Sequence, residues 1–330
     1  MTEQSVFVSV IILNWNGGDY LLRCVKSVLE SDYPKNLLEV VVVDNGSTDG
    51  SAEAVKKVYP QIKLIKNKKN LGYCLGNNIG IKNAKGELII LLNNDTIVDK
   101  HWIKEILKKV KDPEVGIVGC KLYFPGTKII QSIGFREKFL GYWESIGAGQ
   151  IDVGQFDNIE EVDYVSGAAL AVKREVLERI GLLDPNFYAY SEDIDLCYRA
   201  RRSGYKVVTS NAIVYHYGSL SWSRFPLKKM YLIMRNRIYF IRKHYSPKAL
   251  IKFIFIYPIK STWFDLYRSI KGETILQKII NQDKRARQQK LFVEMLNIVT
   301  TRCVIFFIAI LLEIIKRKNK KYKNNLDKDL

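Results

Sequence analysis

The first two thirds of the chain alternate short apolar runs with longer amphipathic stretches. Apolar runs of four to eight residues are typical of strands buried on both faces of a sheet, and they cover residues 6–13, 38–43, 62–65, 88–92 and 115–118. Apolar residues three or four positions apart predict helices, and these cover residues 20–29, 51–59, 77–81, 102–110 and 174–180. Strands that alternate with helices indicate βαβ units, so the predicted fold class is α/β with a mainly parallel central sheet and flanking helices.

Later regions have less regular patterns. Residues 122–160 are poor in periodicity and rich in Gly and aromatic residues, which predicts an irregular or antiparallel region that wraps a substrate. Residues 162–172 are apolar, but the small residues 166–169 interrupt them and allow a ligand or another backbone to approach closely. Short strands are predicted again at residues 206–208 and 212–215.

A polar triplet ends the most apolar of the early runs. Residues 88–92 are all Leu or Ile, and Asn93, Asn94 and Asp95 follow directly. In an open parallel sheet the residues just past the carboxyl end of a strand form the ligand crevice, so Asp95 is expected to hold a metal ion bound to a phosphate group. The alternative is a strand followed by an Asx turn. Asp44 ends a neighbouring predicted strand, and two acidic residues at neighbouring strand ends favour a ligand site.

Another carboxylate stands at the start of a predicted helix, residues 191–203, which Ser191 is expected to cap. By the 3.6-residue period Asp193 shares a face with apolar residues and is expected to point toward the core, whereas Glu192 and Asp195 fall on the other face. Such a carboxylate is a natural general base, because the helix holds it rigidly and the helix dipole keeps it ionised. The alternative role is a helix cap or an ion pair.

Histidines and cysteines do not form a zinc site in this sequence. The three histidines lie far apart, and the five cysteines show neither a C-x-x-C pair nor a zinc-ligand spacing. We therefore expect reduced, mostly buried thiols in a cytosolic setting. His216 follows the predicted strand of residues 212–215, so contact with a metal or a phosphate is one interpretation, and an ordinary core or surface histidine is the other.

The net charge of +18 is concentrated in the last third of the chain. Residues 1–224 contain 28 Lys and Arg against 27 Asp and Glu, whereas residues 225–330 contain 24 against 7, a net charge of +17. Nucleic-acid binding is one interpretation of such a block. Apolar runs lie beside these lysines, however, which suits an anionic membrane surface better, and no nucleic-acid partner is expected. The predicted domains are a catalytic domain, 1–224, and a basic amphipathic helical region, 225–330.

The basic region contains two segments that bear on membrane contact. Residues 231–245 form a candidate basic amphipathic helix. Residues 303–312 carry no charge, but this run is well short of the roughly 20 residues that a spanning helix needs. Helices that lie on the membrane surface are therefore expected, and a helical cap on the catalytic domain is the alternative. Because no basic-then-apolar signal peptide opens the chain, the expected location is the cytoplasmic face of the cell membrane, peripheral or monotopic.

Five segments taken together resemble the family-two inverting glycosyltransferases, in particular the rhamnosyltransferase-like branch. In chain order they are VIILNWNG at 10–17, VVDNGSTDGS at 42–51, LLNNDT at 91–96, DYVSGA at 163–168 and SEDIDL at 191–196. Each segment alone is a weak signal, whereas five in the right order are a strong one, and the resemblance covers about residues 6–222. The resemblance implies the GT-A fold of nucleotide-diphospho-sugar transferases.

The resemblance also implies roles for individual residues. Asp44 would contact the nucleobase, Asp95 would hold a divalent metal on the diphosphate, and Asp193 would be the catalytic base. His216 begins the segment HYGSLS, which corresponds to the family's His-x-Gly-x-Ser stretch near the diphosphate, and it is the second expected metal contact. The further residues expected to bind the donor are Asn14, Asn16, Asn45, Gly72, Asn78, Asn93 and Asn94. The residues expected to bind the acceptor are Ser166, Gly167 and Glu192.

One departure from the family concerns its Asp-x-Asp motif, which is Asn93-Asn94-Asp95 here and lacks one carboxylate. Metal binding is then expected to be weaker, or Asn93 to contact the ribose. Mg²⁺ and Mn²⁺ both prefer oxygen ligands, so the phosphates of the donor would supply much of the coordination. The sequence leaves the choice between these two metals open.

The expected function is inverting transfer of a sugar from a nucleotide-diphosphate sugar, such as dTDP-rhamnose or a UDP-sugar. The acceptor would be a hydroxyl group of a glycan or of a lipid-linked acceptor in the synthesis of cell-surface polysaccharide or glycoconjugate. A nucleotidyltransferase would need a Gly-rich loop with an arginine after the first strand, and residues 14–18 contain no arginine. A noncatalytic membrane-binding protein on a degenerate GT-A fold would explain the basic region but not Asp44, Asp95 and Asp193. The sequence predicts neither the sugar and its base nor the oligomeric state.

Overall fold

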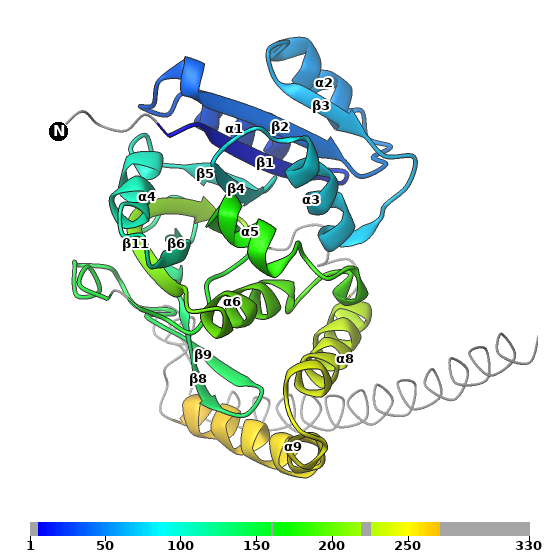
Figure 1. Cartoon of the computed structure of the whole chain (residues 1–330), viewed down its shortest axis with the longest axis vertical. Helices are drawn as coiled ribbons and strands as arrows, with labels where there is room; N and C mark the ends of the chain where they lie inside the picture. Colours follow the sequence, from blue (N-terminus) through cyan, green and yellow to red (C-terminus); the bar gives the residue numbers. More distant parts are fainter. Residues whose placement is uncertain (1–5, 160, 219–225, 271–330) are drawn as a thin grey trace, which may run out of the picture. The chain divides into compact units, whose positions relative to one another are not determined.

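The chain is seen in a computed structural model that describes residues 6–159, 161–218 and 226–270. Figure 1 shows the order of its elements along the chain. The described residues fall into two compact units, one within Met1–Lys138 and Trp143–Arg224, the other within Phe139–Tyr142 and Phe225–Leu330.

The first unit is built on a nine-stranded sheet with the order β3-β2-β1-β4-β10-β6-β11-β5, and β7 pairs with β6. Its strands are β1 (Val8–Asn14), β2 (Leu38–Asp44), β3 (Lys63–Lys66), β4 (Leu88–Asn93), β5 (Thr96–Val98), β6 (Val115–Tyr123), β7 (Ile130–Ser132), β10 (Ala169–Lys173) and β11 (Lys206–His216). Strands β3, β2, β1 and β4 run parallel, as do β6 and β11, whereas β10 is antiparallel to β4 and β6. The predicted α/β class with a mainly parallel sheet is confirmed. Strands β8 (Phe135–Phe139) and β9 (Tyr142–Ser145) form a separate two-stranded sheet.

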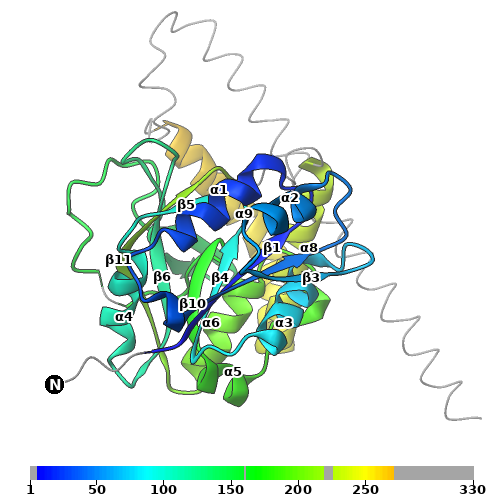
Figure 2. The ribbon, with the colours of Figure 1, turned by 90° about the horizontal axis from the view of Figure 1, so that it is seen from above.

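Helices cover both faces of the large sheet (Figure 2). Those of the first unit are α1 (Gly18–Leu29), α2 (Ser51–Val58), α3 (Gly72–Asn83), α4 (Trp102–Val110), α5 (Arg174–Ile180) and α6 (Glu192–Arg202), with short 3₁₀ turns at Lys35–Leu37 and Pro185–Phe187. Helices α1, α2 and α4 contribute to one continuous core with the sheet. Helix α3 packs closely on the opposite face, where a Cβ atom at Gly80 would meet the side chain of Ile11 at 2.4 Å. The layers therefore enclose the parallel strands and leave their carboxyl ends for a site.

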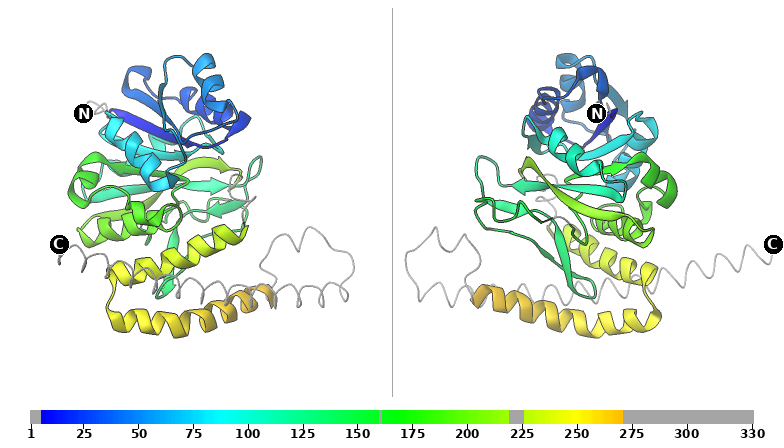
Figure 3. Two further views of the ribbon diagram at one scale, coloured as in Figure 1. Left: turned by 90° about the vertical axis from the view of Figure 1, so that its right-hand side faces the viewer. Right: turned by 60° about the vertical axis from the view of Figure 1, so that its left-hand side comes forward.

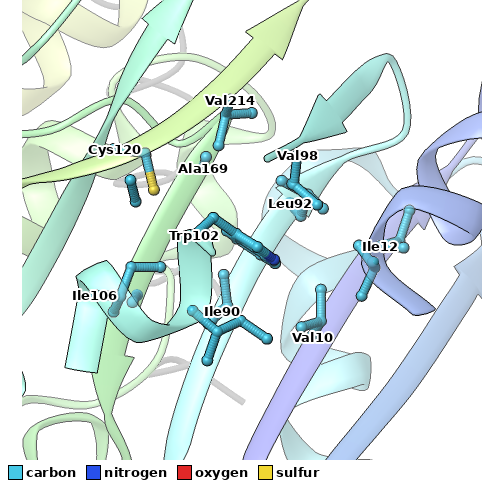
Figure 4. Close-up of a cluster of buried hydrophobic side chains, with 14 of the residues drawn as sticks. Val10, Ile12, Ile90, Leu92, Val98, Trp102, Ile106, Cys120, Ala169 and Val214 are labelled. Carbon is cyan, nitrogen blue, oxygen red and sulfur yellow. The ribbon is translucent and has the colours of Figure 1, made fainter. Parts of the chain in front are cut away.

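The core on the α1 and α4 face is centred on Trp102. Its side chain lies among Ile90, Leu92 and Val98 and is completely buried (Figure 4). The indole Nε1 donates a hydrogen bond of 2.8 Å to Oγ of Ser31, which satisfies the polar edge of the ring inside the core. This packing holds β4 in place, and the residues that follow β4 are the polar triplet predicted to bind a ligand.

Strand β11 differs from the two short strands predicted at 206–208 and 212–215. It is one strand with an irregular register between Thr209 and Ile213. The polar residues at this point look like a loop in the sequence, but Thr209 Oγ1 donates to the carbonyl of Ile133 and Ser210 Oγ to the carbonyl of Gly119. These side-chain hydrogen bonds keep the polar residues inside the sheet.

The predicted orientation of α6 is wrong for Glu192 and Asp195, which were expected away from the core. Both are buried, with 5% and 0% of their surface exposed. Asp195 accepts a hydrogen bond of 2.8 Å from Nε of Arg199, and the guanidinium also donates to the carbonyls of Ile180 and Leu182. Because Arg199 satisfies these polar groups, the polar face of α6 packs against the rest of the protein and is not exposed to water.

The second unit contains α8 (Pro226–His244) and α9 (Pro247–Ile270), which lie side by side (Figure 3). The helix predicted at residues 231–245 coincides with α8 except for Tyr245, because α8 ends at His244. Phe253 of α9 is buried, and a Cβ atom at Gly141 would meet its ring at 2.4 Å. In the described part of the chain, no helix has both the length and the apolar character needed to cross a membrane. The uncharged run predicted at residues 303–312 lies outside the described residues.

Candidate active site

Three predicted site residues lie together because they end neighbouring parallel strands. Asn14 ends β1 and is the register partner of Asp44, the last residue of β2. Asn93 ends β4 on the other side of β1, opposite Leu13. The carboxyl ends of β1, β2 and β4 therefore lie at one edge of the sheet, with β1 between the two strands that precede Asp44 and Asp95.

A buried network of side chains joins the loops that follow β1, β2 and β4. Nδ2 of Asn14 lies 3.0 Å from Oδ1 of Asp44, 3.1 Å from Oγ of Ser47 and 2.9 Å from Oγ of Ser51. Oδ1 of Asn14 accepts a hydrogen bond of 2.9 Å from Nδ2 of Asn94. We call these five residues the Asn14 network. It uses both ends of the Asn14 amide, so this residue positions the loops around the predicted donor site.

Asn16 joins the loop after β1 to the loop after β2, and Asn45 joins the latter to the segment at the start of α3. The backbone N–H of Asn16 donates to Oγ of Ser47, and Oδ1 of Asn16 accepts from the backbone N–H of Thr48 at 2.8 Å. Asn45 donates from Nδ2 to Oδ1 of Asn70 and to the carbonyl of Gly72. The predicted donor contacts of Asn16 and Asn45 remain predictions, and their side chains have a structural function as well.

Gly72 and Asn78 belong to α3, and both help to fix this helix against neighbouring residues. Gly72 has a φ of +83°, and a Cβ atom there would meet the ring of Tyr188 at 2.5 Å, so only glycine fits. Asn78 exchanges two hydrogen bonds with the backbone of Leu183, at 2.7 and 3.1 Å. Both ends of the Asn78 amide are thereby occupied, and its predicted contact with the donor stays untested.

Asp95 and His216 face each other across two paired strands. Strand β5, which begins directly after Asp95, pairs with the end of β11 so that Thr96 lies opposite His216. Oδ1 of Asp95 lies 3.4 Å from Nε2 of His216, and the two side chains are 9% and 13% exposed. Nε2 of His216 is buried and has no hydrogen-bond partner among the described residues. The structure thus brings these two residues together, and their contact with a metal ion stays a prediction.

This pair fits a divalent cation. A carboxylate oxygen and an imidazole nitrogen both coordinate Mn²⁺, and a buried nitrogen without a partner has a lone pair available for a ligand. Across the described ranges, no group of three or more His, Cys, Asp or Glu side chains gathers as a metal-binding set. A cation held here would therefore take most of its ligands from outside the protein, as the missing carboxylate of the Asp-x-Asp position also indicates.

Asp193 is fixed by backbone groups at the start of α6. Its Oδ2 accepts a hydrogen bond of 3.0 Å from the N–H of Gly167, and its Oδ1 accepts one of 2.9 Å from the N–H of Ile194. Burial raises the pKa of this carboxyl above the usual value of 3.8, against the opposing effect of the two N–H donors. A carboxylate with a raised pKa accepts a proton more readily at neutral pH, which suits the predicted general base.

The segment that includes Gly167 connects Asp193 to the loop that carries Asp95. The N–H of Asn93 donates to the carbonyl of Ala168 at 2.9 Å, and Gly167 is the next residue along. Ser166 accepts from the N–H of Ala168 at 3.3 Å. A Cβ atom at Gly167 would lie 3.5 Å from Oδ2 of Asp193, so glycine keeps the space beside this carboxylate open.

Glu192 differs from its neighbour because part of its carboxyl group is unsatisfied. Its Oε2 is buried and has no hydrogen-bond partner within the described ranges. Burial, and then the charge of Asp193, raise its pKa well above the usual 4.5. The carboxyl therefore tends to keep its proton, and a polar ligand would satisfy it. Its predicted contact with the acceptor stays a prediction.

Two residues near the site have no clear signal in the sequence. Tyr73 of α3 donates from its hydroxyl to the carbonyl of Gly167 at 2.6 Å and so braces the segment beside Asp193. Gln131 of β7 contacts the ring of His216 at 3.0 Å, although the two residues are 85 positions apart. Gln131 belongs to the region without periodicity, where a sequence pattern cannot indicate a tertiary contact.

The four described cysteines are buried and unpaired, as predicted.

Known proteins are similar to this chain in sequence. Residues 9–181 match the family model described as "Glycosyl transferase family 2". The chain is 33% identical over 227 residues, 65% of its length, to the "O-antigen biosynthesis protein RfbC" of Myxococcus xanthus. It is 25% identical over 272 residues, 72% of its length, to the "N-acetylglucosaminyl-diphospho-decaprenol L-rhamnosyltransferase" of Mycobacterium tuberculosis. The matched region spans 84% of the mycobacterial protein, but 17% of the Myxococcus protein and 25% of another relative.

A solved structure has a similar fold. The mannosyltransferase PcManGT of Pyrobaculum calidifontis, in complex with GDP-Man and Mn²⁺, matches with a TM-score of 0.59 and 17% sequence identity. The match covers 93% of this chain and 86% of that chain. At this identity the likeness concerns the fold alone, and it confirms the predicted GT-A architecture.

Proposed function

Because the chain belongs to glycosyl transferase family 2, we propose that it transfers a sugar from a nucleotide-diphosphate sugar to a hydroxyl group, with inversion at the anomeric carbon. One observation carries the proposal: consecutive backbone contacts connect the Asp95 loop to Asp193, through Asn93, Ala168 and Gly167. A candidate base is thereby held at a fixed place relative to a candidate metal pair. Such positioning is what group transfer between two bound substrates requires.

The substrates we propose follow from the site and from the relatives. The Asn14 network would present Asp44 to the nucleobase of a donor such as dTDP-rhamnose or a UDP-sugar. Two relatives are named for O-antigen biosynthesis and for rhamnosyl transfer to a diphospho-decaprenol carrier. These names support a glycan or lipid-linked acceptor in the synthesis of cell-surface polysaccharide or glycoconjugate, with Ser166, Gly167 and Glu192 on the acceptor side.

Asp95 and His216 are the residues that would hold Mg²⁺ or Mn²⁺ beside the diphosphate of the donor. When bound, such a cation neutralises negative charge that develops on the departing diphosphate. The protein supplies one carboxylate oxygen and one imidazole nitrogen, 3.4 Å apart. Asn93 lies at the end of the same strand and is proposed to contact the ribose.

Asp193 would act on the acceptor. Its carboxylate takes the proton of the acceptor hydroxyl as the hydroxyl oxygen forms a bond to the anomeric carbon of the sugar. The bond between that carbon and the phosphate oxygen breaks at the same time, and the nucleoside diphosphate leaves with the electron pair. Attack from the face opposite the leaving group inverts the configuration. The raised pKa of Asp193 makes it a stronger base than an exposed aspartate.

The proposal is tested by binding and hydrolysis of a panel of UDP-, dTDP- and GDP-sugars, each with Mg²⁺, Mn²⁺ or a chelator. The panel is run on wild type, on Asp95→Asn and on the matched control Asp99→Asn. Asp99 lies four positions away, and its Oδ1 accepts a hydrogen bond from the N–H of His101 that an asparagine oxygen also accepts. We expect a metal-dependent response to one donor that Asp95→Asn loses and Asp99→Asn keeps. No response to any donor would instead favour a noncatalytic protein on a degenerate GT-A fold.

We also propose that the second unit binds an anionic membrane surface at the cytoplasmic face, where a lipid-linked acceptor would be met. One face of α9 carries Lys248, Ile251, Lys252 and Phe255, spaced by three or four residues, and all four are exposed. Ile251 and Phe255 expose 57% and 70% of their surface. Apolar side chains flanked by lysines suit the boundary between anionic headgroups and acyl chains. The net charge of +17 over residues 225–330 complements such a surface.

Sedimentation with lipid vesicles tests this location. Wild type is expected to bind vesicles that contain phosphatidylglycerol, to bind phosphatidylcholine vesicles weakly, and to release as salt is raised. The double variant Ile251→Ser, Phe255→Ser should bind several-fold more weakly. Val153→Ser is the control, because Val153 is 82% exposed in the first unit. Equal binding of wild type and the double variant would contradict a role for this face.

A further inference from the structure

Gln131 makes two contacts with His216, and together they determine the orientation of its amide. Its Nε2 donates a hydrogen bond to the backbone carbonyl oxygen of His216. Its Oε1 lies 3.0 Å from Nδ1 of the His216 ring. A carbonyl oxygen only accepts hydrogen bonds, so the amide nitrogen must face it, and the amide oxygen must then face the ring.

This orientation selects one tautomer of His216. The amide oxygen of Gln131 has no hydrogen to donate, so the ring nitrogen that faces it must carry the hydrogen. In a neutral imidazole the other nitrogen then has none, and Nε2 presents a lone pair. That nitrogen is the buried atom with no hydrogen-bond partner among the described residues, 3.4 Å from Oδ1 of Asp95.

The opposite tautomer would close the site. A hydrogen on Nε2 would point at the carboxylate of Asp95, and the two side chains would satisfy each other as a hydrogen-bonded pair. A cation would then have to displace that hydrogen before it could bind. With the hydrogen on Nδ1, both facing atoms are electron-pair donors, which only a cation or a donor group between them can satisfy.

We propose that Gln131 is a positioning residue that holds His216 in the tautomer able to coordinate a divalent cation together with Asp95. The inference rests on the proposed metal pair and adds to it a residue from β7 that acts through His216. Groups that orient a metal-bound histidine through its second nitrogen commonly change metal affinity by about 10–100-fold when they are removed.

The tautomer can be observed directly by nitrogen NMR of histidine-labelled protein without metal. The chain has only His101, His216 and His244, so variants that lack one histidine assign the signals. We expect the hydrogen of His216 on Nδ1 in wild type, and a shift of population toward Nε2 in Gln131→Leu. A wild-type signal with the hydrogen already on Nε2 would overturn the proposal, whatever the stability of the variants.

Metal affinity provides the second readout, measured as free Mn²⁺ by electron paramagnetic resonance with and without UDP. Gln131→Leu should bind Mn²⁺ about 10–100-fold more weakly. Gln131→Glu keeps an acceptor for the Nδ1 hydrogen but loses the donor to the His216 carbonyl, so it should keep a higher affinity than Gln131→Leu, since carboxylates also orient metal-bound histidines. Gln155→Leu is the matched control, because the Gln155 side chain is exposed, donates to the carbonyl of Ile151, accepts from the N–H of Val153 and makes no hydrogen bond to a histidine in the parts of the chain that the structure describes.

The outcomes separate this inference from the proposed function. If His216→Ala binds Mn²⁺ as wild type does, the proposed metal pair is wrong. If His216→Ala loses affinity but Gln131→Leu keeps it, the metal pair stands and the role of Gln131 is wrong. Equal losses in Gln131→Leu and Gln131→Glu would also contradict the role, because the acceptor would then not matter. A variant that does not fold leaves the NMR signal of wild type as the deciding result.

Discussion

Two sets of residues at the candidate site differ in how their polar atoms are satisfied. In the Asn14 network every side-chain amide, hydroxyl and carboxylate group has a hydrogen-bond partner inside the protein. In the second set, Oε2 of Glu192 and Nε2 of His216 are buried with no such partner among the described residues. The first set is held by hydrogen bonds within the protein, whereas the second contains buried atoms that a ligand can satisfy.

This difference indicates which residues of the site have a structural role and which ones bind a ligand. A buried polar group without a partner costs about 1–3 kcal/mol of stability, and such groups persist where a ligand supplies the missing partner. In the Asn14 network the polar groups instead form hydrogen bonds with one another and join three loops. We therefore expect substitutions in the Asn14 network to lower stability most, and substitutions of Glu192 or His216 to lower activity most.

The largest effect on stability is expected from Asn14→Ala. The change removes the common partner of four side chains and leaves Asp44 buried with fewer hydrogen bonds, so we expect a loss of about 2–4 kcal/mol in the free energy of unfolding. Urea denaturation measures the loss, and Asn211→Ala, at an exposed asparagine of β11, is the control. A loss below about 1 kcal/mol would contradict a structural role for this network.

A smaller effect is expected from Gly17→Ala, which crowds the same network. Gly17 has a φ of −82°, which any residue can adopt, so the cost is steric. The new Cβ atom would lie 2.4 Å from both Oδ1 of Asn14 and Nδ2 of Asn94. We expect a loss of about 1–3 kcal/mol. Adding Asn94→Ala removes one of these two clashes, so the double variant should lose less stability than the sum of the two single variants, and a fully additive loss would refute this cause.

The smallest effect, with the opposite sign, is expected from Glu192→Gln. Because burial raises the pKa of Glu192, the folded protein keeps a proton that the unfolded chain loses, and wild-type stability falls as pH rises above the usual 4.5. The glutamine variant has no such loss. At pH 5.5 it should be more stable by at most about 1.4 kcal/mol, with weaker acceptor binding. Glu178→Gln, at an exposed residue of α5, is the control. A variant less stable than wild type would contradict this account.

The sequence was sufficient to predict the strand ends, because they depend on the local order of apolar and polar residues along the chain. Apolar runs that end in Asp44 and Asp95 identified the strand ends, because strand identity and the polar break are both local signals. The burial of Asp195 was not predicted, since it depends on Arg199, which bonds to Asp195 and to the carbonyls of Ile180 and Leu182. Gln131 reaches His216 through the pairing of strands far apart in the chain, and no periodicity marks such a contact.

The most direct test of the central claim is the turnover of Asp193→Asn with the donor that the panel selects. Asparagine keeps one oxygen to accept the N–H of Gly167, loses the hydrogen bond from the N–H of Ile194 and cannot take a proton, so the side chain should stay in place but no longer act as a base. We predict unchanged donor affinity and a turnover about 10²–10⁴-fold below that of wild type. Turnover equal to that of wild type, with the variant folded, would show that Asp193 is not the base.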